Sequence, residues 1–260
     1  MIKQSFDRYV VSTYGRSGSV LVTNFIKTYL DMKFGSSTSV FNKLDGWYDV
    51  HPIPPETVYH CHSLRQLDLL PEIPTCGVVF TVREPSICAV SMILRKRLNV
   101  AHVHNPKWID LLNMQKQDLE LSASSQKGIQ YILDEHRQWN DSYDTKFHVD
   151  VKEFQKARND VCYYNSTAIK KLKIINDRVS YLNYSDWQGD LVKLAALLNV
   201  TPFEIYMYNL KNTRHWSQNV SNADEIQKCL DDFAHEDQDL LLNWKNQLFD
   251  NNERDSYASI

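Results

Sequence analysis

The amino-acid sequence predicts an α/β protein with three layers, a central and mostly parallel β-sheet flanked by helices. Short β-rich runs alternate with amphipathic helical patterns at both ends of the chain, which is typical of a parallel sheet covered by helices. Residues 76–82 (CGVVFTV) are apolar on both faces, as a strand buried between two helix layers should be. The 260 residues contain no long Pro-, Gly- or Ser-rich linker, so we expect a single domain over residues 1–260.

Strands and helices alternate clearly in the first 98 residues. Residues 8–14 (RYVVSTY) are β-branched and aromatic, and the stretch between Gly18 and Gly35 has a strongly apolar helical face. Pro85 suits the first turn of a helix, whose basic end complements the helix dipole. The elements expected here are strands at 8–14, 57–62 and 76–82, helices at 19–34 and 85–98, and a loop at 36–55.

The rest of the chain is mostly helical in pattern. Residues 95–175 show helical segments joined by polar loops, with no repeat and no phosphate-binding type of loop. Residues 178–184 (RVSYLNY) predict a fourth strand, and an amphipathic helix follows at 190–200. The acidic tail predicts two helical segments, at 224–233 and 235–249.

Composition excludes several classes of protein. The net charge of −3 and the pI of about 6.3 provide no basic field, so we expect no nucleic-acid partner. No run approaches the roughly 18 apolar residues of a membrane span, and the N-terminus lacks the pattern of a secretory signal. The five cysteines are scattered without a CxxC pair, which predicts a reduced, cytoplasmic protein without disulfides. His102 and His104 lack a third ligand nearby, so no metal site is expected.

Glycine is scarce, and two glycines stand close together between a predicted strand and a predicted helix. The chain has only seven, under half the usual frequency of about 7%. In the loop Gly15-Arg16-Ser17-Gly18-Ser19, backbone N–H groups at the helix start, two hydroxyls and an arginine would suit an anion. The alternative is a plain turn whose arginine faces solvent. The loop is not a Walker A motif, because no lysine precedes either serine.

A second candidate anion site follows the buried strand. Arg83-Glu84-Pro85 joins residues 76–82 to the next helix, which carries Ser91. Ligands of open parallel sheets bind at the carboxyl ends of the strands, so Arg83 should emerge at the same edge as the glycine loop. Taken alone, Arg83 could simply form a salt bridge. Together, the two sites indicate a ligand with two separated phosphate-like groups.

These motifs resemble those of a known family. Residues 13–21 (TYGRSGSVL) resemble the 5′-phosphosulfate loop of sulfotransferases that use 3′-phosphoadenosine 5′-phosphosulfate. Residues 82–91 (VREPSICAVS) resemble the 3′-phosphate motif of that family, in which Arg-x-Pro is followed by a serine. Residues 59–71 (YHCHSLRQLDLLP) and 181–187 (YLNYSDW) are similar to two further family segments, and residues 212–222 weakly resemble its C-terminal closing segment.

The resemblance implies a P-loop-like fold and a set of donor-binding residues. The first motif would hold the 5′-phosphosulfate, and Arg83 with Ser91 would hold the 3′-phosphate. Arg16 would also neutralise the charge that builds on the leaving oxygen during transfer. The implied set is Gly15, Arg16, Ser17, Gly18, Ser19, Val20, Arg83, Ser91, Tyr184 near the adenine, and Arg214 or alternatively Lys211. The alternative for Tyr184 is a core tyrosine at the end of a strand.

A histidine is the expected general base. His62 matches the catalytic histidine of the family, but His60 lies on the same face of a strand and competes for the role. Some relatives use a glutamate in the helix after the phosphate loop instead. Residues 20–30 contain no carboxylate, which favours the histidine.

The resemblance therefore implies a sulfotransferase that moves a sulfuryl group in line to a hydroxyl or amine acceptor, without an obligatory metal. The acceptor could be a small molecule, a glycan or a lipid, and the helical region 95–175 is where its pocket is expected. Leu21 replaces a tryptophan common in the family, and the C-terminal Arg-Lys-Gly triplet is absent. The alternatives are an ATP-dependent phosphotransferase and a nucleotide-binding regulatory protein without catalysis. The acceptor and the oligomeric state are not predicted.

Overall fold

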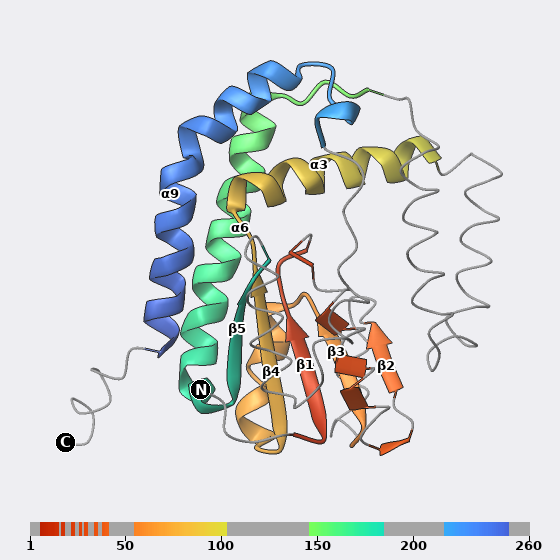
Figure 1. The fold of residues 1–260 in the computed structure, drawn as a ribbon, viewed down its shortest axis with the longest axis vertical. Coiled ribbons are helices and arrows are strands. Elements are labelled where there is room, and N and C mark those ends of the chain that lie inside the picture. The colour runs from red at the N-terminus through yellow and green to blue at the C-terminus, as the bar shows by residue number, and fades with distance from the viewer. Residues whose placement is uncertain are drawn as a thin grey trace.

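In the part of the chain that the structure describes, a five-stranded and wholly parallel sheet forms the centre of the fold (Figure 1). The computed structural model describes residues 6–15, 17–18, 22–23, 26–27, 29–30, 34–35, 38–41, 55–102, 146–184 and 216–249. The strands are β1 (Arg8–Ser12), β2 (Thr38–Phe41), β3 (Thr57–Cys61), β4 (Cys76–Val82) and β5 (Val179–Asn183). Their order in the sheet is β2-β3-β1-β4-β5, so β1 lies in the middle.

Four of these strands confirm the sequence predictions, and one corrects them. β4 has the predicted bounds, and β1, β3 and β5 lie inside their predicted ranges. The prediction of a loop over residues 36–55 was wrong at 38–41, because β2 forms there. β2 has only four residues and pairs with β3 alone, so it occupies a sheet edge. Such a short run gives too little alternation to be separated from a loop.

The helices agree with the predictions in place but differ in length. α3 (Pro85–His102) is one turn longer than predicted, and α9 (Ala223–Phe249) is continuous where two segments were predicted. α6 (Val151–Leu172) begins at Asp150, whose carboxylate accepts from Lys152 N and Glu153 N. The shorter helices are α2 (Leu64–Leu67), η2 (Leu70–Glu72), η3 (Lys173–Arg178) and η5 (Trp216–Asn219). The helix predicted at 190–200 lies outside the described residues.

Helices cover both faces of the sheet, which confirms the three-layer α/β class. On one face, α6 and α9 lie side by side (Figure 1) and pack against the strands. On the other face, the Tyr9 ring meets Tyr29, a helical residue of the stretch that follows the glycine loop, at 6.2 Å between ring centroids. Tyr9 and Val10 point to opposite faces of β1, and Val10 belongs to the core beneath α6 and α9.

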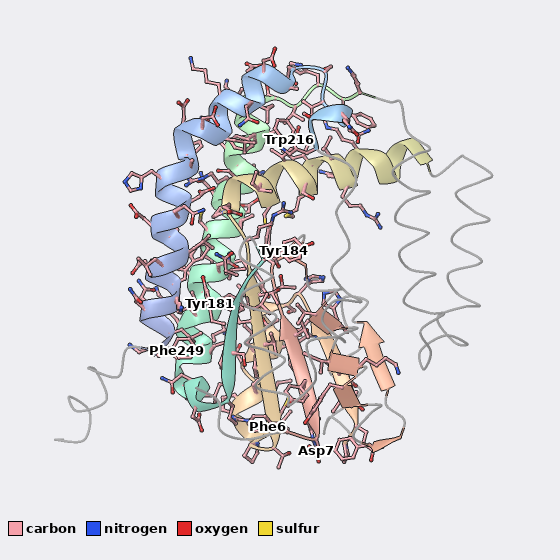
Figure 2. The ribbon with its side chains drawn as sticks, viewed as in Figure 1. Phe6, Asp7, Tyr181, Tyr184, Trp216 and Phe249 are labelled. Atoms are coloured by element: carbon pink, nitrogen blue, oxygen red, sulfur yellow. The ribbon has the colours of Figure 1, made fainter. Side chains whose placement is uncertain are left out.

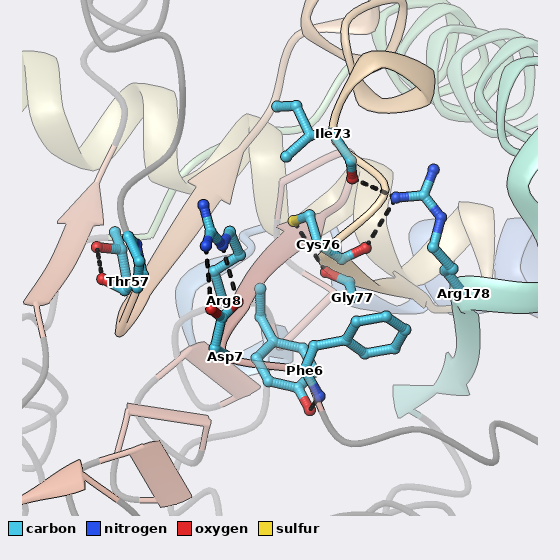
Figure 3. Close-up of polar contacts among 10 residues, drawn as sticks. Phe6, Asp7, Arg8, Thr57, Ile73, Cys76, Gly77 and Arg178 are labelled. Carbon is cyan, nitrogen blue, oxygen red and sulfur yellow. Dashed lines mark hydrogen bonds and ion pairs between the residues drawn. The ribbon is translucent and has the colours of Figure 1, made fainter.

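The amino edge of the sheet is fastened by Arg178, at the end of η3 (Figure 3). Arg178 is 8% exposed, and its guanidinium donates to the carbonyl oxygens of Leu70, Ile73 and Cys76, at 3.2 Å for both Leu70 and Cys76. These carbonyls belong to the connection that enters β4. One side chain therefore joins the start of β5 to the start of β4.

α3 runs across the opposite, carboxyl edge of the sheet (Figure 1). Ala89, Val90, Ile93 and Leu94 bury one side of α3 in a cluster with residues from α6 and α9, including the fully buried Phe154. Arg97 adds an ion pair with Glu153, near the start of α6. The long helices thus hold α3, and with it the chain that leaves β4, at a defined place over the edge where ligands of parallel sheets bind.

Candidate functional site

The glycine loop curls back onto the carboxyl ends of β1 and β4. Thr13 N donates to Cys61 O at 3.1 Å, which keeps the end of β1 beside β3. The Ser17 hydroxyl bonds to Thr13 Oγ1 and, at 3.1 Å, to Thr81 Oγ1 of β4. All three hydroxyl side chains are buried, so their hydrogen bonds hold the loop against the strand ends from the protein interior. The predicted contact of the Ser17 hydroxyl with an anion stays a prediction.

Gly18 is the position where the loop becomes a helix. Its φ of +79° lies in the left-handed region that favours glycine, and Val22 N donates to Gly18 O at 3.1 Å. The first N–H groups of a helix have no partners within the helix and point out of its end. The helical turn that Val22 N closes onto Gly18 O follows the carboxyl end of β1, and the start of a helix is its positive dipole end.

Tyr184 packs directly against Gly18. It follows β5 at the carboxyl edge, whereas Phe6 and Asp7 mark the opposite edge (Figure 2). A Cβ added at Gly18 would lie 2.0 Å from Tyr184 Cδ2 and 2.2 Å from Cε2. Only glycine lets the ring approach this closely. The absence of a side chain at Gly18 thus joins the loop to the end of β5.

Arg83 completes this group of residues. It is half-buried after β4, and its Cζ lies 5.3 Å from the centroid of the Tyr184 ring, within cation–π range. The structure therefore brings the glycine loop, Arg83 and Tyr184 to one edge of the sheet, although they are far apart in the sequence. This agrees with the expectation that Arg83 emerges at the edge of the loop.

The two candidate histidines lie in contact but in different environments. Their ring centroids are 4.3 Å apart, His60 is 6% exposed, and His62 reaches solvent. Burial, together with the neighbouring His62, lowers the pKa of His60 to about 3. Partial loss of hydration also lowers the pKa of His62, and a hydrogen bond to the backbone of Thr13 opposes that shift.

The tautomer of His62 follows from its bond to the loop. Its Nδ1 lies 2.9 Å from Thr13 O, and a carbonyl oxygen only accepts, so Nδ1 carries the proton. Nε2 is then the nitrogen that can take a proton from another molecule. His62 is exposed and lies beside the loop, whereas its neighbour His60 is buried.

The remaining predicted site residues are Ser91, Gly15 and a group that lies outside the described residues. Ser91 is half-buried on α3, six residues after Pro85. A side chain at Gly15 would meet no atom within 4 Å, so the loop is open at that position. Arg16, Ser19, Val20, Leu21, Lys211 and Arg214 lie outside the described residues.

Several residues at this edge were not predicted. Thr13 and Thr81 carry the hydroxyls that hold the loop, and each stands near the carboxyl end of a central strand, a position that could have marked them. A buried pair, Arg158 of α6 and Asp237 of α9, holds the start of α3. These two residues are 79 positions apart, and no local pattern links them.

The described part of the chain lacks two further kinds of feature. No group of three or more His, Cys, Asp and Glu side chains within it is arranged to hold a metal ion. None of the helices in those residues has the length and apolar character needed to cross a bilayer.

No protein-family model and no curated protein sequence matches the chain. Among solved structures, the chain is similar to the crystal structure of mouse sulfotransferase SULT7A1 complexed with PAP. The two share 13% sequence identity at a TM-score of 0.41, over 94% of this chain and 89% of that one. At this level, the similarity does not place the chain in a family.

Proposed function

We propose that this chain is a sulfotransferase that moves the sulfuryl group of 3′-phosphoadenosine 5′-phosphosulfate to a hydroxyl or amine acceptor. The observation that carries the proposal is the contact group at the carboxyl edge. Tyr184 packs on Gly18, with Arg83 5.3 Å from its ring centroid, beside a loop bonded to His62. A helix start and a separate arginine at one edge suit a ligand with two anionic groups.

In this proposal the two ends of the donor bind to segments that follow different strands. The 5′-phosphosulfate accepts hydrogen bonds from the N–H groups of the loop from Ser17 to Val20, and Arg16 is the cation beside it. The 3′-phosphate is bound by Arg83 and Ser91, with Arg214 or Lys211 as a further cation. The adenine lies near Tyr184. Holding both ends fixes the sulfur atom in line between the leaving oxygen and the acceptor.

His62 serves as the general base. Its Nδ1 is engaged by Thr13 O, so Nε2 takes the proton of the acceptor hydroxyl. The acceptor oxygen forms a bond to sulfur, and the bond from sulfur to the 5′-phosphate oxygen breaks. Adenosine 3′,5′-bisphosphate leaves with the electron pair of that bond, and Arg16 and the loop N–H groups stabilise its charge.

The remaining parts of the proposal concern the setting of the site. The reaction needs no obligatory metal ion, as the family resemblance implies. One domain spans residues 1–260, and residues 95–175 contribute the acceptor side. None of the five cysteines is joined in a disulfide, the state that a reducing compartment such as the cytoplasm maintains.

Transfer of labelled sulfate from the donor to a panel of phenols, sterols, glycans and lipids tests the proposed chemistry. His62→Ala should abolish transfer while the affinity for adenosine 3′,5′-bisphosphate stays unchanged. His60→Ala is the matched comparison and should keep a larger share of the activity, because His60 is buried. Loss of transfer in His60→Ala with full transfer in His62→Ala would reassign the base.

A further inference from the structure

A buried ion pair lies at the start of α3, directly after Arg83. Arg158 is 4% exposed and Asp237 is 1% exposed. Arg158 donates to Asp237 Oδ1 from Nε at 3.0 Å and from Nη2 at 2.7 Å. Its Cζ also lies 4.0 Å from the centroid of the Phe233 ring, and Glu236 Oε1 lies 3.0 Å from Nη2. The guanidinium is therefore enclosed and held in one orientation.

The second oxygen of Asp237 is directed at the backbone of α3. Ser86 N donates to Asp237 Oδ2 at 2.8 Å, and Arg158 Nε lies 3.1 Å from Ser86 Oγ. The next residue of α9, Gln238, donates to Glu84 Oε1 at 3.2 Å. Pro85 between them is buried. The segment 84–86, which comes directly after Arg83, is thus bonded to α9 at Glu84 and at Ser86.

Arg83 is consequently fixed from both sides. Val82, the residue before it, pairs with Asn183 of β5, and Tyr184 follows that residue. The segment after it is held by Asp237, whose own position depends on Arg158. A buried ion pair is weak evidence for stability, since losing the hydration of both charges offsets their attraction. A role in fixing the geometry accounts for this pair better.

We propose that Arg158 and Asp237 are positioning residues that hold Arg83 in place for the 3′-phosphate of the donor. This inference rests on the proposed function. Because Asp237 already accepts from an N–H group in the first turn of α3, that helix end is occupied by a carboxylate. Recognition of the 3′-phosphate then depends on the side chains of Arg83 and Ser91, and on the backbone geometry that directs them.

The measurement is the ratio of two dissociation constants determined by calorimetry. It is the constant for adenosine 5′-monophosphate divided by that for adenosine 3′,5′-bisphosphate, so a high ratio means strong recognition of the 3′-phosphate. The ligands differ only in the 3′-phosphate, so the ratio reports on its recognition alone. Asp237→Asn should reduce the ratio about tenfold or more, as small displacements of a positioned group do. The amide accepts on one side only, so either Ser86 N or Arg158 loses its acceptor.

A double variant removes the ambiguity of a folding defect. Replacing a whole buried ion pair by apolar residues of similar volume is often neutral or stabilising, so Arg158→Met with Asp237→Leu should fold. Its melting temperature should be close to that of the wild type while the ratio of dissociation constants stays low. A purely structural role would restore the ratio along with the stability, and that result overturns the inference.

A control and a reference complete the design. Asp239→Asn changes a carboxylate on the same helix that is 70% exposed, and should leave the ratio unchanged. Arg83→Ala should lower the ratio by itself, and adding Asp237→Asn to it should lower the ratio no further. Additive effects would contradict a role through Arg83.

If the wild type binds both nucleotides equally, the proposed function fails. If the wild type discriminates and the double variant does too, only this inference fails.

Discussion

Gly18→Ala tests the packing of the loop against the end of β5. The new Cβ would lie 2.0 Å from Tyr184 Cδ2, and alanine would have to adopt a φ of +79°. The left-handed backbone costs about 1–2 kcal/mol, and displacing a packed ring costs about 1–3 kcal/mol. The free energy of unfolding should therefore fall by about 2–5 kcal/mol, which lowers the melting temperature by roughly 5–15 °C.

Two other glycines of the chain serve as matched controls. Gly35 has a φ of +86° with no atom within 4 Å of a new Cβ, so Gly35→Ala should cost only the backbone part, about 1–2 kcal/mol. Gly15 has the same open surroundings, and Gly15→Ala should change the stability by less than about 1 kcal/mol.

The steric part of the cost can be isolated with a double variant. In a Tyr184→Ala background the ring is absent, so Gly18→Ala should there cost no more than Gly35→Ala does. Urea unfolding of the variants measures these differences. Equal losses in Gly18→Ala with and without Tyr184, or a loss no greater than that in Gly35→Ala, would refute the close packing of the loop and the ring.

Three further predictions concern stability and reactivity. Since burial lowers the pKa of His60 to about 3, the folded state resists its protonation, and stability should fall as the pH drops below about 6.5. Between pH 6.5 and 5, protonation of His60 in the unfolded state should lower the free energy of unfolding by about 2 kcal/mol. Urea titrations should find this loss in the wild type and not in His60→Leu. Arg178→Met should lower the free energy of unfolding by about 2–4 kcal/mol, because three carbonyls at the amino edge lose a buried donor. Calorimetry should nevertheless show an unchanged affinity for the bisphosphate, and weakened binding would contradict the separation of the two edges. Burial raises the pKa of Cys61 and Cys76 to about 12, so both should resist iodoacetamide until the protein unfolds, and rapid labelling of the native protein would contradict their burial.

Strong local patterns predicted much of the fold. Residues 76–82 are apolar on both faces because β4 is covered by helices on both sides, so composition alone marks its bounds. β2 escaped prediction because an edge strand of four residues depends on pairing with β3 rather than on its own sequence. The continuity of α9 also depends on packing, since its buried residues join one cluster with α3 and α6 and another with α6 and the sheet.

The arrangement of the candidate site was predictable where its residues are local in the sequence. The glycine loop and the arginine after β4 are each recognisable within ten residues, and the parallel topology brings them to one edge. The different environments of His60 and His62 could not be predicted, because strand alternation places both on one face, and burial of one and exposure of the other depend on the surrounding fold. The hydroxyl contact between Ser17 and Thr81 spans 64 positions and leaves no local signal.

Binding of adenosine 3′,5′-bisphosphate in comparison with ATP–Mg²⁺ tests the central claim most directly, because it needs no knowledge of the acceptor. At a ligand concentration of 100 times its dissociation constant, the bisphosphate should stabilise the protein by about 2.7 kcal/mol and raise its melting temperature by roughly 5–10 °C. The same concentration of ATP–Mg²⁺ should give a clearly smaller shift, and Arg83→Ala should remove the difference. Equal shifts from both nucleotides, or none from the bisphosphate, would contradict the assignment of this edge to a donor with a 3′-phosphate.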